Sequence, residues 1–371
     1  MGDFTERVKR KNKYNLSKLP LTISAKYGLV DQITFFNKIV ASTDMSNYYL
    51  LKKGEFAYNK SYSNDYPWGA IKRLDNYEQG VLSALYICFA TQDNVESDFI
   101  LQYFESPKWH KSVSEIAVEG ARNHGLLNIS VQDFFQTYHY VPKEKKEQTK
   151  IATLLHLIDE RISTQNKIIE DLKKLKSAII EIEYSSRTKT SSHIGDFIVQ
   201  TSKRNKDNAI QTILSISNRQ GFIQQSEQFE NRSVASDDTS NYKIVERNSF
   251  AFNPARINVG SIARLATFDR GIVSPMYICF RTKDNLFPEY LDYYFESKQF
   301  FTEIQKRLEG SVRQCLSFEG LCNIPLSIPT IEVQQQTGKR LSTLAQEIKL
   351  EIDFLELLQK QKKFLLHQMF I

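Results

Sequence analysis

The chain has 371 residues, of which 41% are hydrophobic, 12% aromatic and 25% charged. This length exceeds what one hydrophobic core usually covers, so we expect two globular domains. The composition excludes a disordered or fibrous chain, while a net charge of +6 at pH 7 permits a polyanionic partner without establishing one.

Hydropathy and cysteine spacing exclude several further classes of protein. The first 13 residues are polar and charged rather than a secretory signal, and the longest apolar run, residues 84–90, is too short to span a bilayer. We therefore expect a cytoplasmic protein without a membrane partner. The four cysteines form no Cys-x-x-Cys pair, which argues against a zinc site or a redox motif.

Residues 1–142 are expected to form a mixed α/β domain. The alternation in Leu21-Thr22-Ile23-Ser24, followed by Gly28, predicts a strand and a tight turn. Farther along, the apolar spacing within residues 98–106 predicts an amphipathic helix. Pro142 closes this first domain.

Residues 143–184 contain neither Gly nor Pro and are rich in Leu, Lys, Glu, Ala and Ile, so propensity favours one long helix. Residues recur at alternating steps of three and four, which is the a/d spacing of a coiled coil. Six of these positions are apolar, namely Leu155, Ile158, Ile162, Ile169, Leu172 and Ile179, and Gln165 and Lys176 fill the other two.

Residues 185–330 repeat the first domain. Gly2-Asp3-Phe4 recurs as Gly195-Asp196-Phe197, and Tyr103-Phe104-Glu105-Ser106 recurs as Tyr294-Phe295-Glu296-Ser297. Several other phrases recur in the same order between these two. The repeating unit is therefore a whole domain with its helix attached, which is much longer than the unit of a solenoid.

Residues 331–371 repeat the coiled-coil spacing. Leu341, Leu344, Ile348, Leu355, Leu358 and Leu365 carry the pattern, with Glu351 and Lys362 at the polar positions. Each lies the same distance in sequence from its counterpart in residues 143–184. The simpler alternative is two unrelated surface helices, but the matched polar interruptions favour an intramolecular pair.

We therefore predict an α+β fold in the order domain, helix, domain, helix, with boundaries at 1–142, 143–184, 185–330 and 331–371. Parallel and antiparallel pairing of the helices are both possible with this order. We expect the antiparallel coiled coil, which avoids long connections and places the domains at opposite ends of a rod.

Groups that catalysis requires are missing from the sequence. The six histidines show no His-Glu-x-x-His spacing, and no Gly-x-x-x-x-Gly-Lys or Gly-x-Gly-x-x-Gly phrase is present to hold phosphates. The phrase Asn253-Pro254-Ala255-Arg256 lacks the second proline and the aromatic residue of the adenine-methyltransferase motif. We expect no catalytic, metal or cofactor-binding residues.

The two repeats share their apolar strands and helices, whereas their polar loops diverge. A duplicated catalytic domain would keep matching reactive residues in at least one copy. The divergent loops are rich in Arg, Lys, Asn, Gln and Tyr, the residue types that contact phosphates and base edges. The pattern favours two recognition surfaces on one scaffold, with ordinary solvated loops as the alternative for any single residue.

In these features the chain resembles the specificity (S) subunit of a type I restriction-modification system. The resemblance covers essentially the whole chain and rests on the duplication, on the helix opening Glu147-Gln148-Thr149-Lys150-Ile151-Ala152 after Val141-Pro142, and on the tail at residues 360–370. One departure is the phrase Gln334-Gln335-Gln336-Thr337-Gly338, which is expected to interrupt the opening of the second helix. The chain is also expected to start inside the first recognition domain.

The resemblance implies a non-catalytic DNA-binding subunit that serves defence against foreign DNA. Each domain would be a target-recognition domain that reads one half of a bipartite, asymmetric site in double-stranded DNA. The helices would set the spacer and dock methyltransferase (M) subunits, two in all, with restriction (R) subunits joining through the complex. S-adenosylmethionine, ATP and Mg²⁺ are expected only in those partner subunits.

The basic turns are expected to contact phosphates, and the loop residues to read bases. In the first domain the candidates are Arg10, Lys11, Lys13, Lys60, Tyr62, Asn64 and Arg122. In the second domain they are Lys203, Arg204, Lys206, Arg256, Asn258, Arg313 and Gln314.

Two other functions are compatible with parts of the pattern. A two-domain coiled-coil scaffold that binds proteins or small molecules would show the same helices, but it would lack steep salt-dependent affinity for DNA. A self-contained adenine methyltransferase would need the motifs that are missing here.

Overall fold

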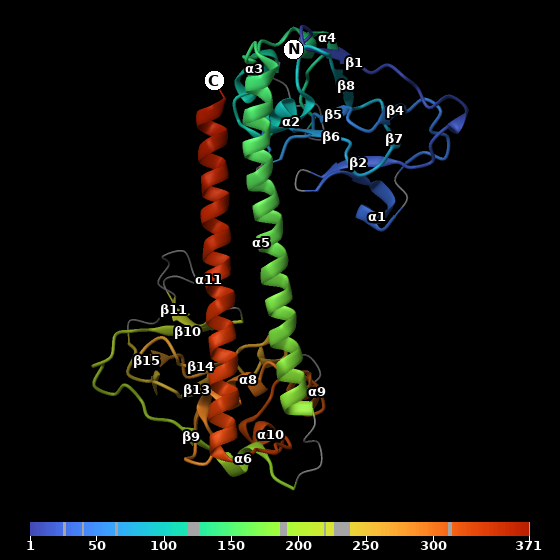
Figure 1. Ribbon diagram of the computed structural model, residues 1–371. Helices are drawn as coiled ribbons and strands as arrows, with labels where there is room; N and C mark the ends of the chain where they lie inside the picture. Colours follow the sequence, from blue (N-terminus) through green and yellow to red (C-terminus); the bar gives the residue numbers. More distant parts are fainter. Residues whose placement is uncertain are drawn as a thin grey trace. The chain divides into compact units, whose positions relative to one another are not determined.

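The computed structural model describes residues 1–24, 27–38, 41–63, 66–117, 126–185, 191–218, 220–225, 238–310 and 314–370. The chain forms two compact units (Figure 1). Unit 1 comprises residues 1–166 and 353–371, and unit 2 comprises residues 167–352. No helix in the described ranges is long and apolar enough to cross a membrane.

Two long helices contribute to both units, α5 (Lys145–Ser185) and α11 (Ile331–Met369). In unit 1, Asp159 of α5 forms an ion pair with Lys362 of α11, at 2.5 Å. In unit 2, Glu183 near the end of α5 lies 3.7 Å from Arg340 near the start of α11. The predicted antiparallel pairing is therefore confirmed within each unit. The four consecutive domains stay a prediction, because each compact unit includes part of both helices.

The predicted coiled-coil positions face inward. Leu155, Ile158 and Leu358 are buried in unit 1, and Ile169, Leu341 and Ile348 are buried in unit 2. Every other predicted position, including the polar ones, is buried or half-buried. The heptad spacing thus identified the inner face of both helices.

The described residues of unit 1 form a four-stranded antiparallel sheet in the order β1-β8-β5-β6 and two two-stranded pairs, β2-β3 and β4-β7. Its strands are β1 (Thr5–Arg7), β2 (Leu21–Ser24), β3 (Gly28–Asp31), β4 (Tyr49–Lys52), β5 (Phe56–Asn59), β6 (Ala70–Arg73), β7 (Gln79–Leu82) and β8 (Ile87–Thr91). Its helices besides the long pair are η1 (Lys13–Asn15), α1 (Gln32–Phe36), α2 (Ser97–Glu105), α3 (His110–Ile116) and α4 (Val131–Gln136).

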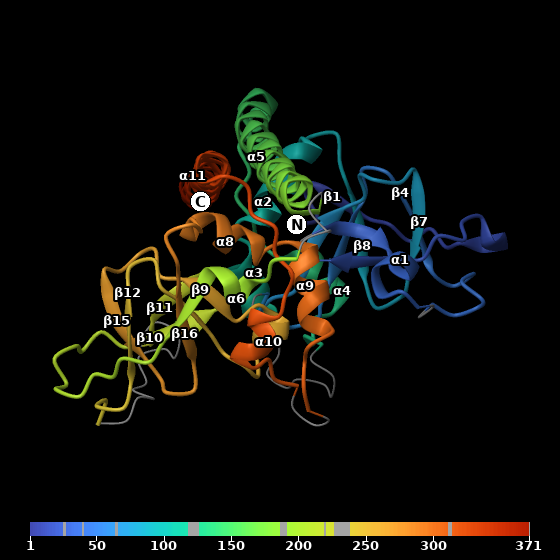
Figure 2. The ribbon, with the colours of Figure 1, turned by 90° about the horizontal axis from the view of Figure 1, so that it is seen from below.

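Unit 2 repeats this topology, with a sheet in the order β14-β13-β16-β9 and the pairs β10-β11 and β12-β15. Its strands are β9 (Ile198–Thr201), β10 (Leu214–Ser217), β11 (Gly221–Gln224), β12 (Lys243–Glu246), β13 (Phe250–Phe252), β14 (Ile262–Arg264), β15 (Arg270–Val273) and β16 (Ile278–Thr282). Besides the long pair, the helices among its described residues are α6 (Ile194–Phe197), η2 (Ile257–Val259), α8 (Pro288–Tyr294), α9 (Lys298–Gln305) and α10 (Phe318–Cys322). Figure 2 shows α8, α9 and α10 from below.

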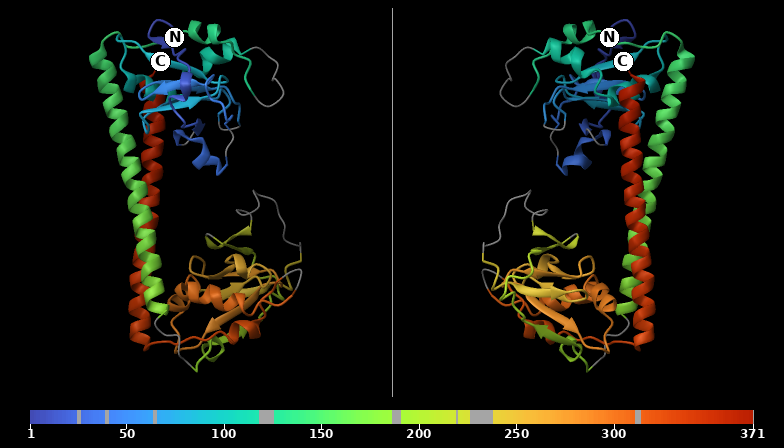
Figure 3. Two further views of the ribbon diagram at one scale, coloured as in Figure 1. Left: turned by 90° about the vertical axis from the view of Figure 1, so that its right-hand side faces the viewer. Right: turned by 90° about the vertical axis from the view of Figure 1, so that its left-hand side faces the viewer.

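Corresponding aromatic residues form the core of each unit. Phe56 stacks on Phe89 across β5 and β8, with ring centroids 5.2 Å apart, and Phe250 stacks on Phe280 at 5.1 Å. In unit 2, α8 lies beside the helix pair (Figure 3), where the Tyr184 hydroxyl donates a hydrogen bond to the Tyr290 carbonyl. In unit 2 the short helix α8 is thereby hydrogen-bonded to the long helix α5.

Glycine occurs at the same place in both repeats because the backbone passes very close to a leucine. A Cβ on Gly80 would lie 2.4 Å from Leu21, and one on Gly271 would lie 2.5 Å from Leu214. Neither separation leaves room for a side chain. These contacts hold each two-stranded pair against its neighbour.

A buried glutamine ties each long helix to its own unit. The Gln148 side chain accepts a hydrogen bond from the Glu96 amide at 2.7 Å and donates one to the Pro142 carbonyl at 2.7 Å. Gln334 accepts from the Phe287 amide at 2.7 Å and donates to the Pro329 carbonyl at 2.9 Å. We call Gln148 and Gln334 the paired latch glutamines.

The phrase at residues 334–338, which left the start of the second helix open, lies inside that helix. Helix α11 begins at Ile331 and continues through Gly338, whose Cβ position faces Phe287 at 3.1 Å. Gly338 occupies the place that buried Ala152 takes in α5. A small residue is needed there because the helix packs closely against the unit, so the glycine serves packing rather than termination.

Candidate nucleic-acid interface

The basic turn of unit 1 is fixed by a buried asparagine. The Asn12 side chain donates to the Ser17 carbonyl and accepts from the Ser17 amide, both at 2.9 Å. Asn12 is fully buried, so these hydrogen bonds are shielded from water. The turn that carries Arg10, Lys11 and Lys13 is therefore held in one conformation.

Two of the three predicted cations in this turn are bound within unit 1. The Arg10 guanidinium forms a fork of hydrogen bonds to the Glu55 carboxylate, the shortest at 2.8 Å. The Lys11 ammonium donates to the Asn47 carbonyl at 2.9 Å and lies 3.6 Å from the centre of the Tyr49 ring. Lys13 is exposed. Of the three, Lys13 has the geometry best suited to a phosphate.

An aromatic residue projects beside Lys13. Tyr14 is 93% exposed and has a φ of +62°, an unfavourable value for a residue with a side chain. Sequence reasoning did not single it out, because nothing in its local pattern distinguishes a projecting tyrosine from a core tyrosine. Its exposure beside a fixed basic turn leaves both its ring and its hydroxyl accessible to a ligand bound there.

The basic turn of unit 2 has the same internal support. The Asn205 side chain donates to the Ile210 carbonyl at 2.9 Å and accepts from the Ile210 amide at 3.1 Å. Lys203, Arg204 and Lys206 are all exposed, and the Arg204 guanidinium donates to the Asn241 side-chain oxygen at 2.9 Å.

In unit 2 the three predicted cations of the basic turn, Lys203, Arg204 and Lys206, line one hollow of about 320 Å³ together with Arg270. Asp207 and Glu246 also line it, so cations outnumber carboxylates there. Sequence reasoning missed Arg270, because it lies in a strand and its counterpart in the first repeat is Gln79. The hollow concentrates positive charge where a phosphate could sit.

The difference between the two turns has a simple cause. Glu55, which holds Arg10, corresponds to Ser249 in the second repeat. Unit 2 has no carboxylate at that position to bind Lys203, the counterpart of Arg10. The two units thus share a backbone support but present different charges.

The remaining predicted residues lie on other segments. Lys60 donates to the Ile129 carbonyl at 3.1 Å, and Tyr62 is 54% exposed. Arg256, just before η2, is exposed, and Asn258 in η2 is half-buried. Neither lines the basic hollow. Gln314 is exposed. Asn64, Arg122 and Arg313 lie outside the described residues. The structure therefore brings together the cations of one turn, and the base-reading residues stay predictions.

The described residues contain no group of His, Cys, Asp and Glu side chains placed to hold a metal ion. Burial raises the pKa of the Cys88 thiol to about 12 and that of the Cys279 thiol to about 11, so both stay protonated at neutral pH. These two cysteines are counterparts in the repeat and serve as core residues.

The second half of the chain matches a known family. Residues 222–360 match the family model of the type I restriction modification DNA specificity domain. The sequence matches no curated protein.

Two solved structures share the fold over nearly the whole chain. One comes from a study of complex assembly and conformational transition of the type I R-M system. It is 12% identical, has a TM-score of 0.57, and the match covers 99% of this chain and 95% of that chain. The other is a type I restriction-modification system S subunit from M. genitalium, with 14% identity, a TM-score of 0.57, and coverage of 100% and 94%. The resemblance inferred from the sequence is confirmed, as is the predicted fold class.

Proposed function

We propose that the whole chain is the sequence-specificity subunit of a type I restriction-modification complex, because residues 222–360 match the family model of the type I restriction modification DNA specificity domain. Each unit reads one half of an asymmetric, bipartite site in double-stranded DNA. The observation that carries the proposal is the duplicated fold with unlike surfaces, seen in the basic hollow of unit 2 and the internally paired turn of unit 1.

The two units share a fold but differ in their surface charges, which explains why the DNA site would be asymmetric. A symmetric dimer reads two copies of one half-site, because its two halves are identical. Here the supports Asn12 and Asn205 are kept while the charged side chains around them differ. The two units would therefore prefer different half-sites.

The rest of the proposal concerns partners. The long helices set the spacer and dock two methyltransferase subunits, and restriction subunits join through that complex. The chain itself is non-catalytic and binds no cofactor, so S-adenosylmethionine, ATP and Mg²⁺ act in the partner subunits. Its place is the cytoplasm, where it meets foreign DNA.

A salt titration tests DNA recognition. The purified chain, alone and with its methyltransferase subunit, is used to select from a random DNA library, and binding to the selected sequence is measured over a range of salt concentrations. We expect a gapped sequence whose binding weakens steeply as salt rises, because each phosphate contact releases about 0.9 counterion. Salt-independent or sequence-independent binding would favour a scaffold without DNA recognition.

A further inference from the structure

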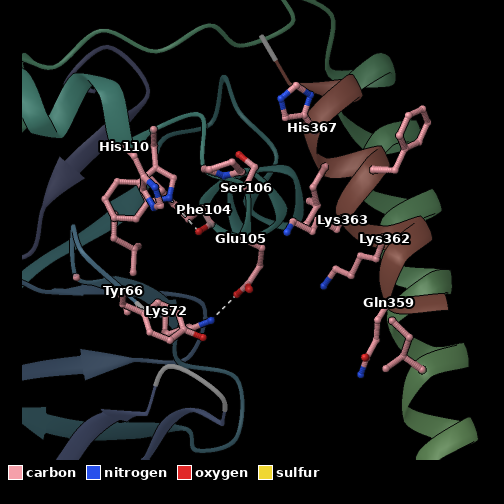
Figure 4. A pocket seen from close by; sticks show the side chains of 18 of the residues that line it. Tyr66, Lys72, Phe104, Glu105, Ser106, His110, Gln359, Lys362, Lys363 and His367 are labelled. Atoms are coloured by element: carbon pink, nitrogen blue, oxygen red, sulfur yellow. Dashed lines mark hydrogen bonds and ion pairs between the residues drawn. The ribbon is translucent and has the colours of Figure 1, made fainter. Parts of the chain in front are cut away.

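A hollow of about 730 Å³ lies in unit 1 where the domain meets helix α11 (Figure 4). Its apolar wall includes Ile71, Phe104 and Trp109, all buried in the core of the unit. Its rim on α11 includes Lys360, Lys363 and His367, which are exposed. We call this space the first junction hollow.

The corresponding junction of unit 2 is bridged by side chains. Lys176 of α5 forms an ion pair with Glu296 at 2.7 Å, and the Glu181 carboxylate accepts a hydrogen bond from the Lys298 amide at 2.9 Å. The space that remains beside residues 295–302 is about 400 Å³. In unit 2 a carboxylate of the long helix thus occupies the place that His367 takes in unit 1.

Three sequence differences explain why the first junction is open. Lys362, the counterpart of Lys176, is bound to Asp159 at 2.5 Å, and the position of Asp159 is Ala345 in the second repeat. Glu105, the counterpart of Glu296, is bound to Lys72, also at 2.5 Å, and the position of Lys72 is an alanine in the second repeat.

The third difference is Pro107, which corresponds to Lys298 and has no amide hydrogen to donate. Even a carboxylate at position 367 would therefore lack the backbone donor that Glu181 has. The open hollow follows from the residues of this chain, and its volume lies in the range of ligand-binding pockets.

The lining of the hollow specifies an occupant. An apolar side chain in the hollow would bury the apolar wall and so gain hydrophobic free energy. The ammonium groups of Lys360 and Lys363 favour an anion next to that side chain. Figure 4 shows Lys363 extending from α11 toward Glu105 and Ser106. The carboxylate among the described lining residues, Glu105, is already paired with Lys72.

We propose that the first junction hollow binds an acidic segment of a methyltransferase subunit that carries an aromatic or aliphatic side chain. This inference rests on the proposed function for the identity of the partner. Unit 2 closes the same junction with its own Glu181, so the two methyltransferase subunits bind unequally. The subunit at the first junction gains a contact that the other lacks.

The first test uses the chain alone with 4-phenylbutyrate, an apolar carboxylate, as the probe. The two tryptophans, Trp68 and Trp109, give two indole N–H resonances in an NMR spectrum, and a Trp68→Phe variant assigns them. We expect a saturable shift at Trp109, with about tenfold weaker binding of the uncharged 4-phenylbutanamide. No saturable shift, or equal binding of the amide, overturns the proposed chemistry of the hollow.

The second test measures the stoichiometry of the complex with the co-expressed methyltransferase subunit by native mass spectrometry. Lys360→Glu with Lys363→Glu reverses the charge of the rim. The matched control, Lys18→Glu with Lys38→Glu, makes the same change of net charge at exposed positions of unit 1 that lie outside both long helices. We expect the rim variant to lose one of two methyltransferase subunits at limiting concentration and the control to keep both.

The outcomes separate this inference from the proposed function. A rim variant that keeps both subunits with unchanged affinity, or a control that loses one equally, overturns the hollow as a docking site. A wild-type chain that binds no methyltransferase subunit contradicts the proposed function, and the probe experiment then still decides whether the hollow binds an apolar carboxylate.

Discussion

At the scale of single residues, the two repeats keep the side chains that support the backbone of the basic turns and differ in the charged side chains around them. Asn12 and Asn205 make the same pair of hydrogen bonds, and the latch glutamines do likewise. Arg10 and Lys203 occupy corresponding positions but have different surroundings. Replacing the two classes of residue should therefore have different consequences.

The first prediction concerns the latch glutamines. Gln334→Ala leaves the Phe287 amide and the Pro329 carbonyl without their partner at a buried site. Each unsatisfied buried group costs about 1–3 kcal/mol, so we expect a clear loss of stability in unit 2. Urea unfolding and hydrogen exchange at the Phe287 amide measure this loss. Gln335→Ala, at an exposed neighbouring position, is the control and should change stability by less than about 0.5 kcal/mol.

The second prediction concerns pH. Burial lowers the pKa of His139 to about 3, and the positive charge of the terminal amino group adds to this effect. The Thr137 hydroxyl donates its hydrogen to the Phe134 carbonyl, so it accepts a hydrogen bond from Nε2 of His139. The Tyr103 hydroxyl donates to Nδ1 of the same ring. The imidazole therefore carries one proton and is neutral.

Because the folded pKa lies below the unfolded value of about 6.5, the unfolded chain binds the extra proton between these values. The contribution of neutral His139 to the free energy of unfolding is complete above about pH 6.5. It decreases as pH falls below that value, by about 1.4 kcal/mol per pH unit. Comparing the unfolding free energies of wild type and His139→Gln at pH 7.5 and 5.5 isolates this term. A His139→Gln variant with the same pH dependence as wild type would contradict it; exposed His156→Gln is the control.

The third prediction separates phosphate contacts from internal ion pairs. Lys203→Ala with Lys206→Ala removes two exposed cations from the basic hollow, so DNA affinity should fall for all sequences and the salt slope by about 0.9 per lost contact. Arg10→Ala breaks the pair with Glu55 and should lower the stability of unit 1 while leaving the salt slope unchanged. If Arg10→Ala lowered the salt slope of DNA binding and the Lys203→Ala, Lys206→Ala variant did not, the proposed roles of these residues would be wrong.

At the scale of elements, the long helices were the most predictable part of the chain. Their heptad spacing is a local signal, so the seam positions could be assigned without knowing the partner helix, and the structure buries or half-buries every one. Strand β2 and helix α2 were likewise visible as local patterns. The role of Gly338 was not, because whether a glycine ends a helix or fills a close contact depends on tertiary packing, here against Phe287.

The candidate site was less predictable than the fold. The cationic turns could be found because Lys and Arg cluster in sequence, but the pairing of Arg10 with Glu55 joins residues far apart in the chain. Arg270 enters the basic hollow from a strand that carries no basic pattern. Such contacts depend on tertiary packing, which residue types and spacing do not specify.

The fourth prediction tests the inner face of α11. Leu341 is 0% exposed and lies in the core of unit 2, whereas Leu350 on the same helix is 56% exposed. Leu341→Ala should cost about 2–5 kcal/mol through lost burial and a residual cavity, while Leu350→Ala should change stability by less than about 0.5 kcal/mol. Chemical denaturation of the two variants gives both values. Equal losses would contradict the assigned face.

At the scale of the whole molecule, we propose that the long helices set the length of the spacer between the two DNA half-sites. Helix α5 has 41 residues, and an α-helix rises about 1.5 Å per residue, so its length is about 60 Å. Removing one heptad from both α5 and α11 at matched seam positions removes about 10 Å, which equals about three base pairs. We expect the spacer to shorten by that amount while both half-sites keep their sequences.

Above all, we propose that this chain supplies two different half-site specificities to one complex. Methylome sequencing of cells that express the chain together with its methyltransferase subunit tests it most directly. The account predicts methylation at an asymmetric, bipartite motif with an unread spacer, and none when the chain is omitted. A palindromic or uninterrupted motif, or methylation that persists without the chain, would contradict it.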